Sequence, residues 1–127
     1  MMKVSFDFDS TLALPIIQKL AERHISFGDE VHITTTRHPT HLDDYDSKHL
    51  LARHRTGLNI DLFRISDRLG IDRDNIHFTK SYDKVHFLKS FDIHYDDDEH
   101  EIDLITRSDL ICTGILINYK NYYLDSE

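Results

Sequence analysis

The sequence contains one cysteine, two prolines and no tryptophan, and it has no apolar run long enough to cross a membrane. A single cysteine, Cys112, cannot form an internal disulfide, and its apolar neighbours at 110–117 predict a small buried side chain. Charged residues at positions 3, 7 and 9 interrupt the N-terminus, which therefore lacks the pattern of a signal peptide. We expect a protein of the reducing cytoplasm with no membrane segment.

Basic residues are few: 15 lysines and arginines stand against 23 aspartates and glutamates, which gives a formal net charge of −8. This balance argues against a long nucleic acid as partner, because the chain would repel its phosphates. Half of the imbalance comes from two short clusters, Asp7 with Asp9 and Asp96 with Asp97. The ten histidines include no pair with helical metal-ligand spacing and a suitable third ligand, so no zinc site is expected.

Short apolar runs alternate with helical periodicity along 127 residues, a length that suits one domain. The pattern predicts strands at 3–8, 30–35, 75–79, 91–95 and 110–117. It predicts helices at 15–24, 44–53, 60–69, 82–89 and 99–107, and it leaves the tail at 118–127 open between a helix and an extension. Such alternation indicates an α/β, Rossmann-like domain whose five-stranded, mostly parallel sheet has helices on both faces.

The first predicted strand ends in two carboxylates, Asp7 and Asp9, one residue apart. Residues two apart on a strand project to the same face, so we expect both carboxylates to converge on one point. Neighbouring anions raise each other's pKa unless a cation lies between them. The pair therefore predicts a site for a hard metal ion.

Chemically useful side chains also follow the other predicted strands. In parallel sheets, ligands bind beyond the carboxyl ends of the strands, where these side chains would gather. Carboxylates, hydroxyls and an ammonium group at one sheet edge suit Mg²⁺ and a phosphate. The side chains are Thr11 after the first strand, Thr34 to Arg37 after the second, Lys80 and Lys84 after the third, and Asp96 to Asp98 after the fourth.

The order DxDxT, a strand ending in Thr, a Lys, and a strand ending in DD resembles the haloacid dehalogenase (HAD) superfamily of phosphohydrolases. The likeness covers nearly the whole chain, and the first motif, Phe6 to Leu12, departs from the usual pattern only at Ser10, where glycine is commonest. The resemblance implies a HAD-like fold and a Mg²⁺-dependent phosphomonoester hydrolase, with an aspartyl-phosphate intermediate.

The resemblance also implies a role for each motif residue. Asp7 would be the nucleophile, and Asp9 the general acid that later acts as base. Asp96 would complete the metal shell with Asp7 and the main-chain carbonyl of Asp9, supported by Asp97. Thr35 would bind the transferring phosphoryl group.

Further substrate contacts are expected from Thr11, Thr36 and Arg37, although Arg37 could instead pair with a nearby aspartate. The third-motif lysine is Lys84 or Lys80. Lys84 is preferred because a cation in the first turn of a helix opposes the helix dipole and needs a compensating reason.

Only 23 residues separate Thr11 from Thr35, and the stretch before Asn75 holds two helices, so no cap domain is expected. An open site favours a bulky substrate or closure by a second subunit in a homo-oligomer. Small members without a cap that this chain resembles act on nucleotides or on phosphorylated polynucleotide ends, among others. The acidic surface disfavours a long polyanion, so a small phosphorylated substrate, with a mononucleotide as the first choice, is expected. The basic residues at 49–55 form either a patch over the pocket or a solvated helix face.

Two other classes of function stay open. One is a receiver-like regulatory domain, which a stable phospho-aspartate without turnover would indicate. The other is a non-catalytic phosphoryl-binding member, which ligand binding without chemistry would indicate. Asp98, Glu99 and Glu101 are interpreted as structural acids of a helix N-terminus, with Asp98 as the N-cap.

Overall fold

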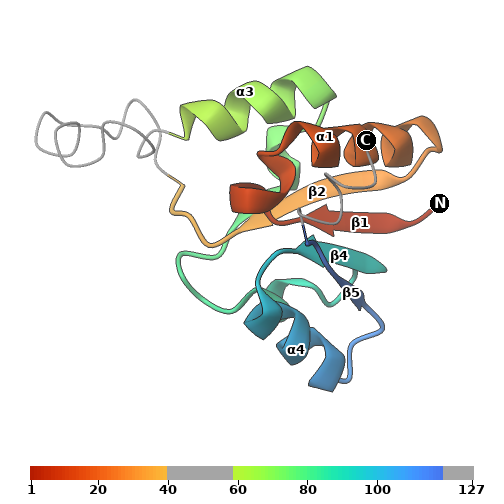
Figure 1. Ribbon diagram of the computed structural model, residues 1–127, viewed down its shortest axis with the longest axis vertical. Coiled ribbons are helices and arrows are strands. Elements are labelled where there is room, and N and C mark those ends of the chain that lie inside the picture. The colour runs from red at the N-terminus through yellow and green to blue at the C-terminus, as the bar shows by residue number, and fades with distance from the viewer. Residues whose placement is uncertain (40–58, 119–127) are drawn as a thin grey trace, which may run out of the picture.

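A five-stranded sheet organises the chain, and all of its strands run parallel (Figure 1). The computed structural model describes residues 1–39 and 59–118. The strand order is β3-β2-β1-β4-β5, which confirms the predicted α/β, Rossmann-like class. The strands are β1 (Lys3–Phe6), β2 (Glu30–Thr35), β3 (Ile76–Phe78), β4 (Ile93–Asp96) and β5 (Thr113–Leu116).

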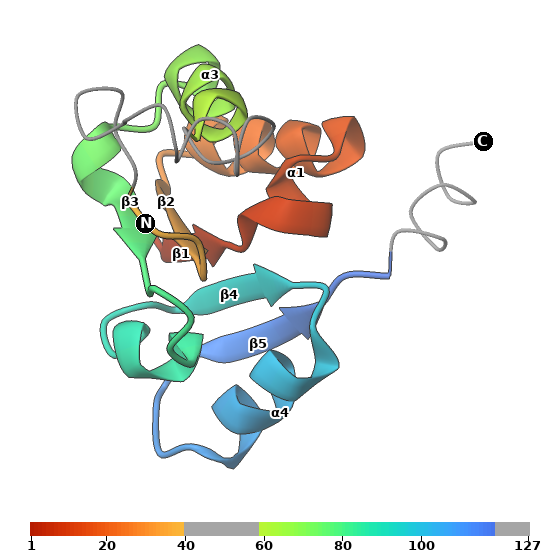
Figure 2. The ribbon, with the colours of Figure 1, turned by 90° about the vertical axis from the view of Figure 1, so that its left-hand side faces the viewer.

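Helices cover both faces of the sheet (Figure 2). The helices α1 (Pro15–Ser26) and α3 (Ile60–Leu69) lie on one face, and α4 (Glu99–Arg107) lies on the other. Pro15 occupies the first turn of α1, where its missing N–H costs no hydrogen bond. Gly70 ends α3 with a φ of +79°, a left-handed conformation that favours glycine. None of the helices in the described ranges has the length and apolar character needed to cross a bilayer.

Two apolar cores lie on opposite sides of the sheet, because alternate strand residues face opposite ways. Residues of β1 and β2 pack with α1 and α3 in the larger core, which includes Phe6, Ile17, Ile33 and Leu62. The smaller core packs against α4 and contains Leu88, Phe91, Ile105 and Cys112. Cys112 is therefore a buried apolar side chain, as its neighbours in the sequence predict.

Two predicted elements besides β1 differ from the structure. The segment expected to be a helix at 82–89 forms only the short 3₁₀ helix η4 (Lys84–Phe87), because Val85, His86 and Phe87 have low helix propensity. The strand expected at 110–117 is shorter and lies at the sheet edge, where Leu116 is 42% exposed instead of buried on both faces. The helix expected at 44–53, the basic residues at 49–55 and the tail beyond 118 lie outside the described residues.

The chain leaves β1 earlier than the sequence suggests. The strand ends at Phe6, and the following segment η1 (Phe8–Leu12) is a wide turn closed by a hydrogen bond from the Leu12 N–H to the Asp7 carbonyl at 3.0 Å. Ser10 adopts a φ of +59° in this turn. That left-handed conformation costs a non-glycine residue about 1 kcal/mol, which gives glycine a physical advantage at this position.

Candidate functional site

The candidate site lies where the strand order reverses. The chain places β2 and β3 on one side of β1 and then β4 and β5 on the other, so the reversal falls between β1 and β4. Phe6 pairs with Ile33 of β2 and with Tyr95 of β4, which brings the carboxyl ends of three strands level. A parallel sheet binds ligands at this point. Asp7 and Asp96 occupy it.

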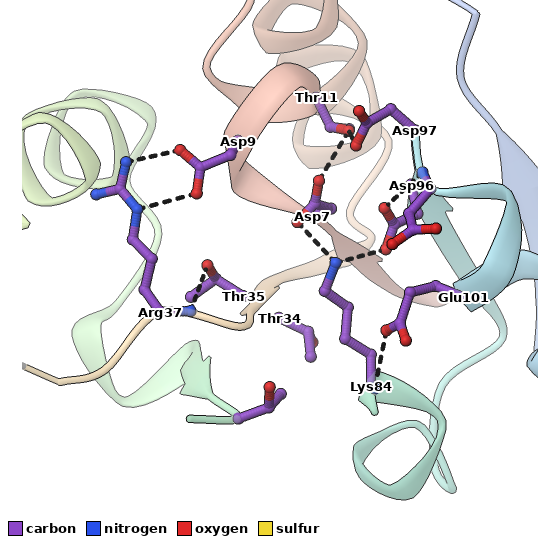
Figure 3. A network of polar contacts seen from close by, with 12 residues as sticks. Asp7, Asp9, Thr11, Thr34, Thr35, Arg37, Lys84, Asp96, Asp97 and Glu101 are labelled. Atoms are coloured by element: carbon purple, nitrogen blue, oxygen red, sulfur yellow. Dashed lines mark hydrogen bonds and ion pairs between the residues drawn. The ribbon is translucent and has the colours of Figure 1, made fainter. Parts of the chain in front are cut away.

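Three carboxylates form the centre of the site. One oxygen each from Asp7, Asp96 and Asp97 lies within 4.8 Å of the others (Figure 3). Asp7 and Asp96 are 6% and 0% exposed. Thr11 shares its hydroxyl proton between Asp7 at 3.2 Å and Asp97 at 3.4 Å. The structure thus brings together four of the residues that the sequence predicts to act at one place.

Lys84 supplies the only cation in direct contact with this cluster among the described residues. Its Nζ donates to Asp7 Oδ1 at 2.8 Å and to Asp96 Oδ2 at 2.7 Å. Both carboxylates raise the pKa of Lys84 although burial opposes them, so the ammonium stays charged. Its main-chain N–H donates to Glu101 Oε2 at 2.9 Å, which fixes the start of η4. Lys80, the other candidate lysine, is exposed.

One ammonium group cannot balance three carboxylates. Burial and the neighbouring Asp96 carboxylate raise the pKa of Asp7 to about 8, against the opposing effect of Lys84. Burial also acts on Asp96, but hydrogen bonds and the charge of Lys84 hold the pKa of Asp96 below its ordinary value. The donor set is all oxygen and carries uncompensated negative charge, which fits a hard divalent cation such as Mg²⁺.

Asp9 does not join this cluster through its side chain. Its carboxylate faces Arg37, which donates from Nη2 at 2.7 Å and from Nε at 3.0 Å (Figure 3). The expectation that Asp7 and Asp9 converge is therefore wrong, because the chain enters the η1 turn directly after Asp7. The prediction that the main-chain carbonyl of Asp9 binds the metal stays a prediction.

Arg37 uses all five of its N–H donors within the protein. Besides Asp9, it donates to Asp61 at 2.8 and 3.0 Å and to Asn59 at 3.2 Å. Its guanidinium also lies 4.9 Å from the centre of the Phe8 ring. Of the two interpretations of Arg37, this geometry matches the aspartate pair. Arg37 connects α3 to the turn that carries Asp9.

The threonines after β2 fall into different environments. Thr35 is fully buried, and its Oγ1 accepts from the Arg37 main-chain N–H at 3.2 Å. No acceptor for its own hydroxyl proton is found in the described part of the chain. Thr34 is buried and pairs with Ser5 at 2.7 Å, whereas Thr36 is exposed.

Several residues of the site escape sequence reasoning. Glu101 resembles a helix N-terminal acid, yet it is 4% exposed and holds Lys84; its position one turn before buried Ile105 is the signal that could have revealed it. His94 lies two residues before Asp96 on β4, so both side chains share a face. No feature of the sequence marks Asp61 as a partner of Arg37. Asp98 caps α4 as expected, accepting from the His100 N–H at 2.9 Å.

Comparison of the sequence with protein-family models and with curated proteins finds no match in either set.

Proposed function

We propose that this protein is a Mg²⁺-dependent phosphomonoester hydrolase that works through an aspartyl-phosphate at Asp7. The observation that carries the proposal is the buried arrangement in which Lys84 bridges Asp7 and Asp96 beside Asp97. It lies at the carboxyl edge of a parallel sheet, and its motif order resembles the HAD superfamily. A site of this kind has a nucleophile, a fixed cation and oxygen ligands for a metal within one cluster.

Three side chains of the protein act on the phosphoryl group in this scheme. An oxygen of Asp7 forms the new bond to phosphorus while the bond from phosphorus to the leaving oxygen breaks. Lys84 and the hydroxyl of Thr35 offset charge on the transferring group. Asp7, Asp96 and Asp97 would hold Mg²⁺, which would supply further charge neutralisation. Water then attacks the phosphorus, which frees Asp7 and releases phosphate.

Asp9 moves the protons in this scheme. It gives one to the leaving oxygen in the first step and takes one from water in the second. Its carboxylate faces Arg37 instead of Asp7, so this role requires the side chain to turn when substrate binds. The pair with Arg37 holds Asp9 beside the site between turnovers.

A small phosphorylated compound is the proposed substrate, with nucleotides as the first class to test. The net charge of −8 disfavours a long polyanion. We further propose that a second copy of the chain covers the site, and that the protein works in a reducing cytoplasm, where its free Cys112 stays reduced.

Phosphate release tests the proposal. Nucleotides, sugar phosphates and an aryl phosphate are incubated with the protein and Mg²⁺, and again with chelator in excess. We expect release from at least one class with Mg²⁺ and none with chelator. If no compound releases phosphate, the proposed phosphatase activity is contradicted and a binding or regulatory role is favoured.

Asp9→Asn is expected to lower kcat on sugar phosphates and nucleotides by about a hundredfold or more, because their leaving oxygens need a proton. An aryl phosphate, whose leaving group departs without protonation, should lose less in the step that forms the aspartyl-phosphate. Single-turnover kinetics on both substrate types measure the difference, with Asp74→Asn, an exposed acid far along the chain, as control. Equal losses on both types would exclude Asp9 as the general acid.

A further inference from the structure

We infer that His94 is a positioning residue for the metal site: through a buried chain of hydrogen bonds it fixes the carboxylate of Asp96 so that one oxygen is presented to the cation. The inference rests on the proposed function, because it assigns a role toward the metal that this function needs. His94 touches neither substrate nor metal in this scheme and acts only through Asp96.

The chain of hydrogen bonds begins on β2 and runs across β1 to β4. Thr34 Oγ1 on β2 lies 2.7 Å from Ser5 Oγ on β1, and Ser5 Oγ lies 2.9 Å from His94 Nδ1 on β4. His94 Nε2 then lies 2.9 Å from Asp96 Oδ2. All four residues are 0% exposed. Three neighbouring strands thus carry one continuous polar row into the acidic cluster.

Which atom donates in each hydrogen bond follows from the carboxylate of Asp96, at which the row ends. A carboxylate can only accept, so His94 Nε2 carries the proton and donates. His94 is fully buried, which disfavours a charged ring, and a neutral ring with its proton on Nε2 leaves Nδ1 as an acceptor. Ser5 must therefore donate to His94, and Thr34 must donate to Ser5. Every donor in the row points toward Asp96.

The row determines which part of Asp96 remains available. Oδ2 accepts from both His94 and Lys84, which fills its two lone-pair positions. Oδ1 accepts from the main-chain N–H of Asp98 at 3.0 Å and keeps one position open. If the His94 donor is removed, Asp96 Oδ2 keeps only its hydrogen bond from Lys84, and the plane of the carboxylate is fixed less firmly. The open position on Oδ1 is then less well oriented.

A second buried histidine shows that this arrangement is not a general property of the sheet. His32 lies on β2 and is 5% exposed. Its ring nitrogens contact His77 at 2.8 Å and Glu30 at 2.5 Å, and neither contact leads to the acidic cluster. His32 is therefore a matched control for the loss of a buried imidazole.

The test measures Mg²⁺ binding itself, by titration calorimetry on the full chain without substrate. His94→Leu is expected to weaken Mg²⁺ binding about tenfold, a common effect of losing a group that orients a metal ligand. His94→Gln should restore most of the affinity, because its amide can donate to Asp96 and accept from Ser5. His32→Leu should bind Mg²⁺ like the wild type. Circular dichroism verifies that each variant is folded.

Unchanged affinity in a folded His94→Leu variant would overturn the inference and leave the proposed function standing. Equal losses of Mg²⁺ affinity in His94→Leu and His32→Leu would also overturn it, since the loss of any buried histidine would then weaken Mg²⁺ binding. Absence of Mg²⁺ binding in the wild type would instead overturn the proposed function. If His94→Leu does not fold, Ser5→Ala replaces it: weaker Mg²⁺ binding supports the inference, and wild-type binding overturns it.

Discussion

Asp7→Asn is expected to lose Mg²⁺-dependent phosphate release by about a thousandfold or more while remaining folded, because asparagine offers no oxygen nucleophile. The amide oxygen can still accept a hydrogen bond from Lys84, so the arrangement of the site is kept. The assay is phosphate release under saturating Mg²⁺ with the best substrate of the panel. Activity within tenfold of the wild type would exclude Asp7 as the nucleophile.

The stability of the same variant should change with pH in a defined direction. Burial raises the pKa of Asp7 from its ordinary value of 3.8 to about 8 in the folded metal-free protein, so the folded state binds the proton more tightly. The stability that this proton contributes is full below the unfolded pKa and is lost as the pH rises through about 8. The asparagine variant has no such loss.

Thermal unfolding in chelator measures this effect. The gain in Tm of Asp7→Asn over the wild type should be larger at about pH 9 than at about pH 5, by roughly 4 °C for each kcal/mol. Other titrating groups contribute to both proteins and cancel in the comparison. A gap in Tm that does not change with pH would contradict the charge balance assigned to the cluster.

Lys84→Met is expected to lower the free energy of unfolding of the metal-free protein by about 3 kcal/mol or more. The ammonium lies 2.8 Å from Asp7 and 2.7 Å from Asp96, and its removal leaves two buried carboxylates without their shared cation. Methionine nearly matches the length of the lysine, so lost packing contributes little. Added Mg²⁺ should restore part of the stability, because it binds only the folded state.

Urea unfolding with chelator and with Mg²⁺ measures both effects. Lys80→Met is the control, since Lys80 is exposed and shares with Lys84 only its place after β3. It should change the free energy of unfolding by about 0.5 kcal/mol or less. The assignment of Lys84 would fail if both variants lost the same stability, or if Lys84→Met were as stable as the wild type.

Sequence reasoning predicts the sheet well because strand periodicity and strand-end chemistry are local. Asp7 and Asp96 are far apart in the chain, yet parallel register alone places the residue after β1 beside the last residue of β4. The position of Asp9 is missed because it depends on the η1 turn, in which Ser10 adopts a left-handed conformation. A pattern of alternating residues cannot reveal such a turn.

Partners from distant elements are also missed, for a different reason. The contact of Arg37 with Asp61 depends on where α3 packs, and no spacing in the sequence specifies that. The row from Thr34 through Ser5 to His94 depends on the order of three strands in the sheet. Polar residues at inward strand positions indicate such a row only after the neighbouring strands are known.

The most direct test of the central claim is capture of the phosphoryl group on Asp7. The Asp9→Asn variant lacks the base that activates water, so an aspartyl-phosphate formed from an aryl phosphate should accumulate in it. The reaction is quenched in acid after mixing with Mg²⁺, and the peptides are mapped by mass spectrometry. We predict a hydroxylamine-sensitive phosphoryl adduct on Asp7 that chelator abolishes. An adduct on another residue, or phosphate release by the wild type with no adduct in the variant, would contradict the account.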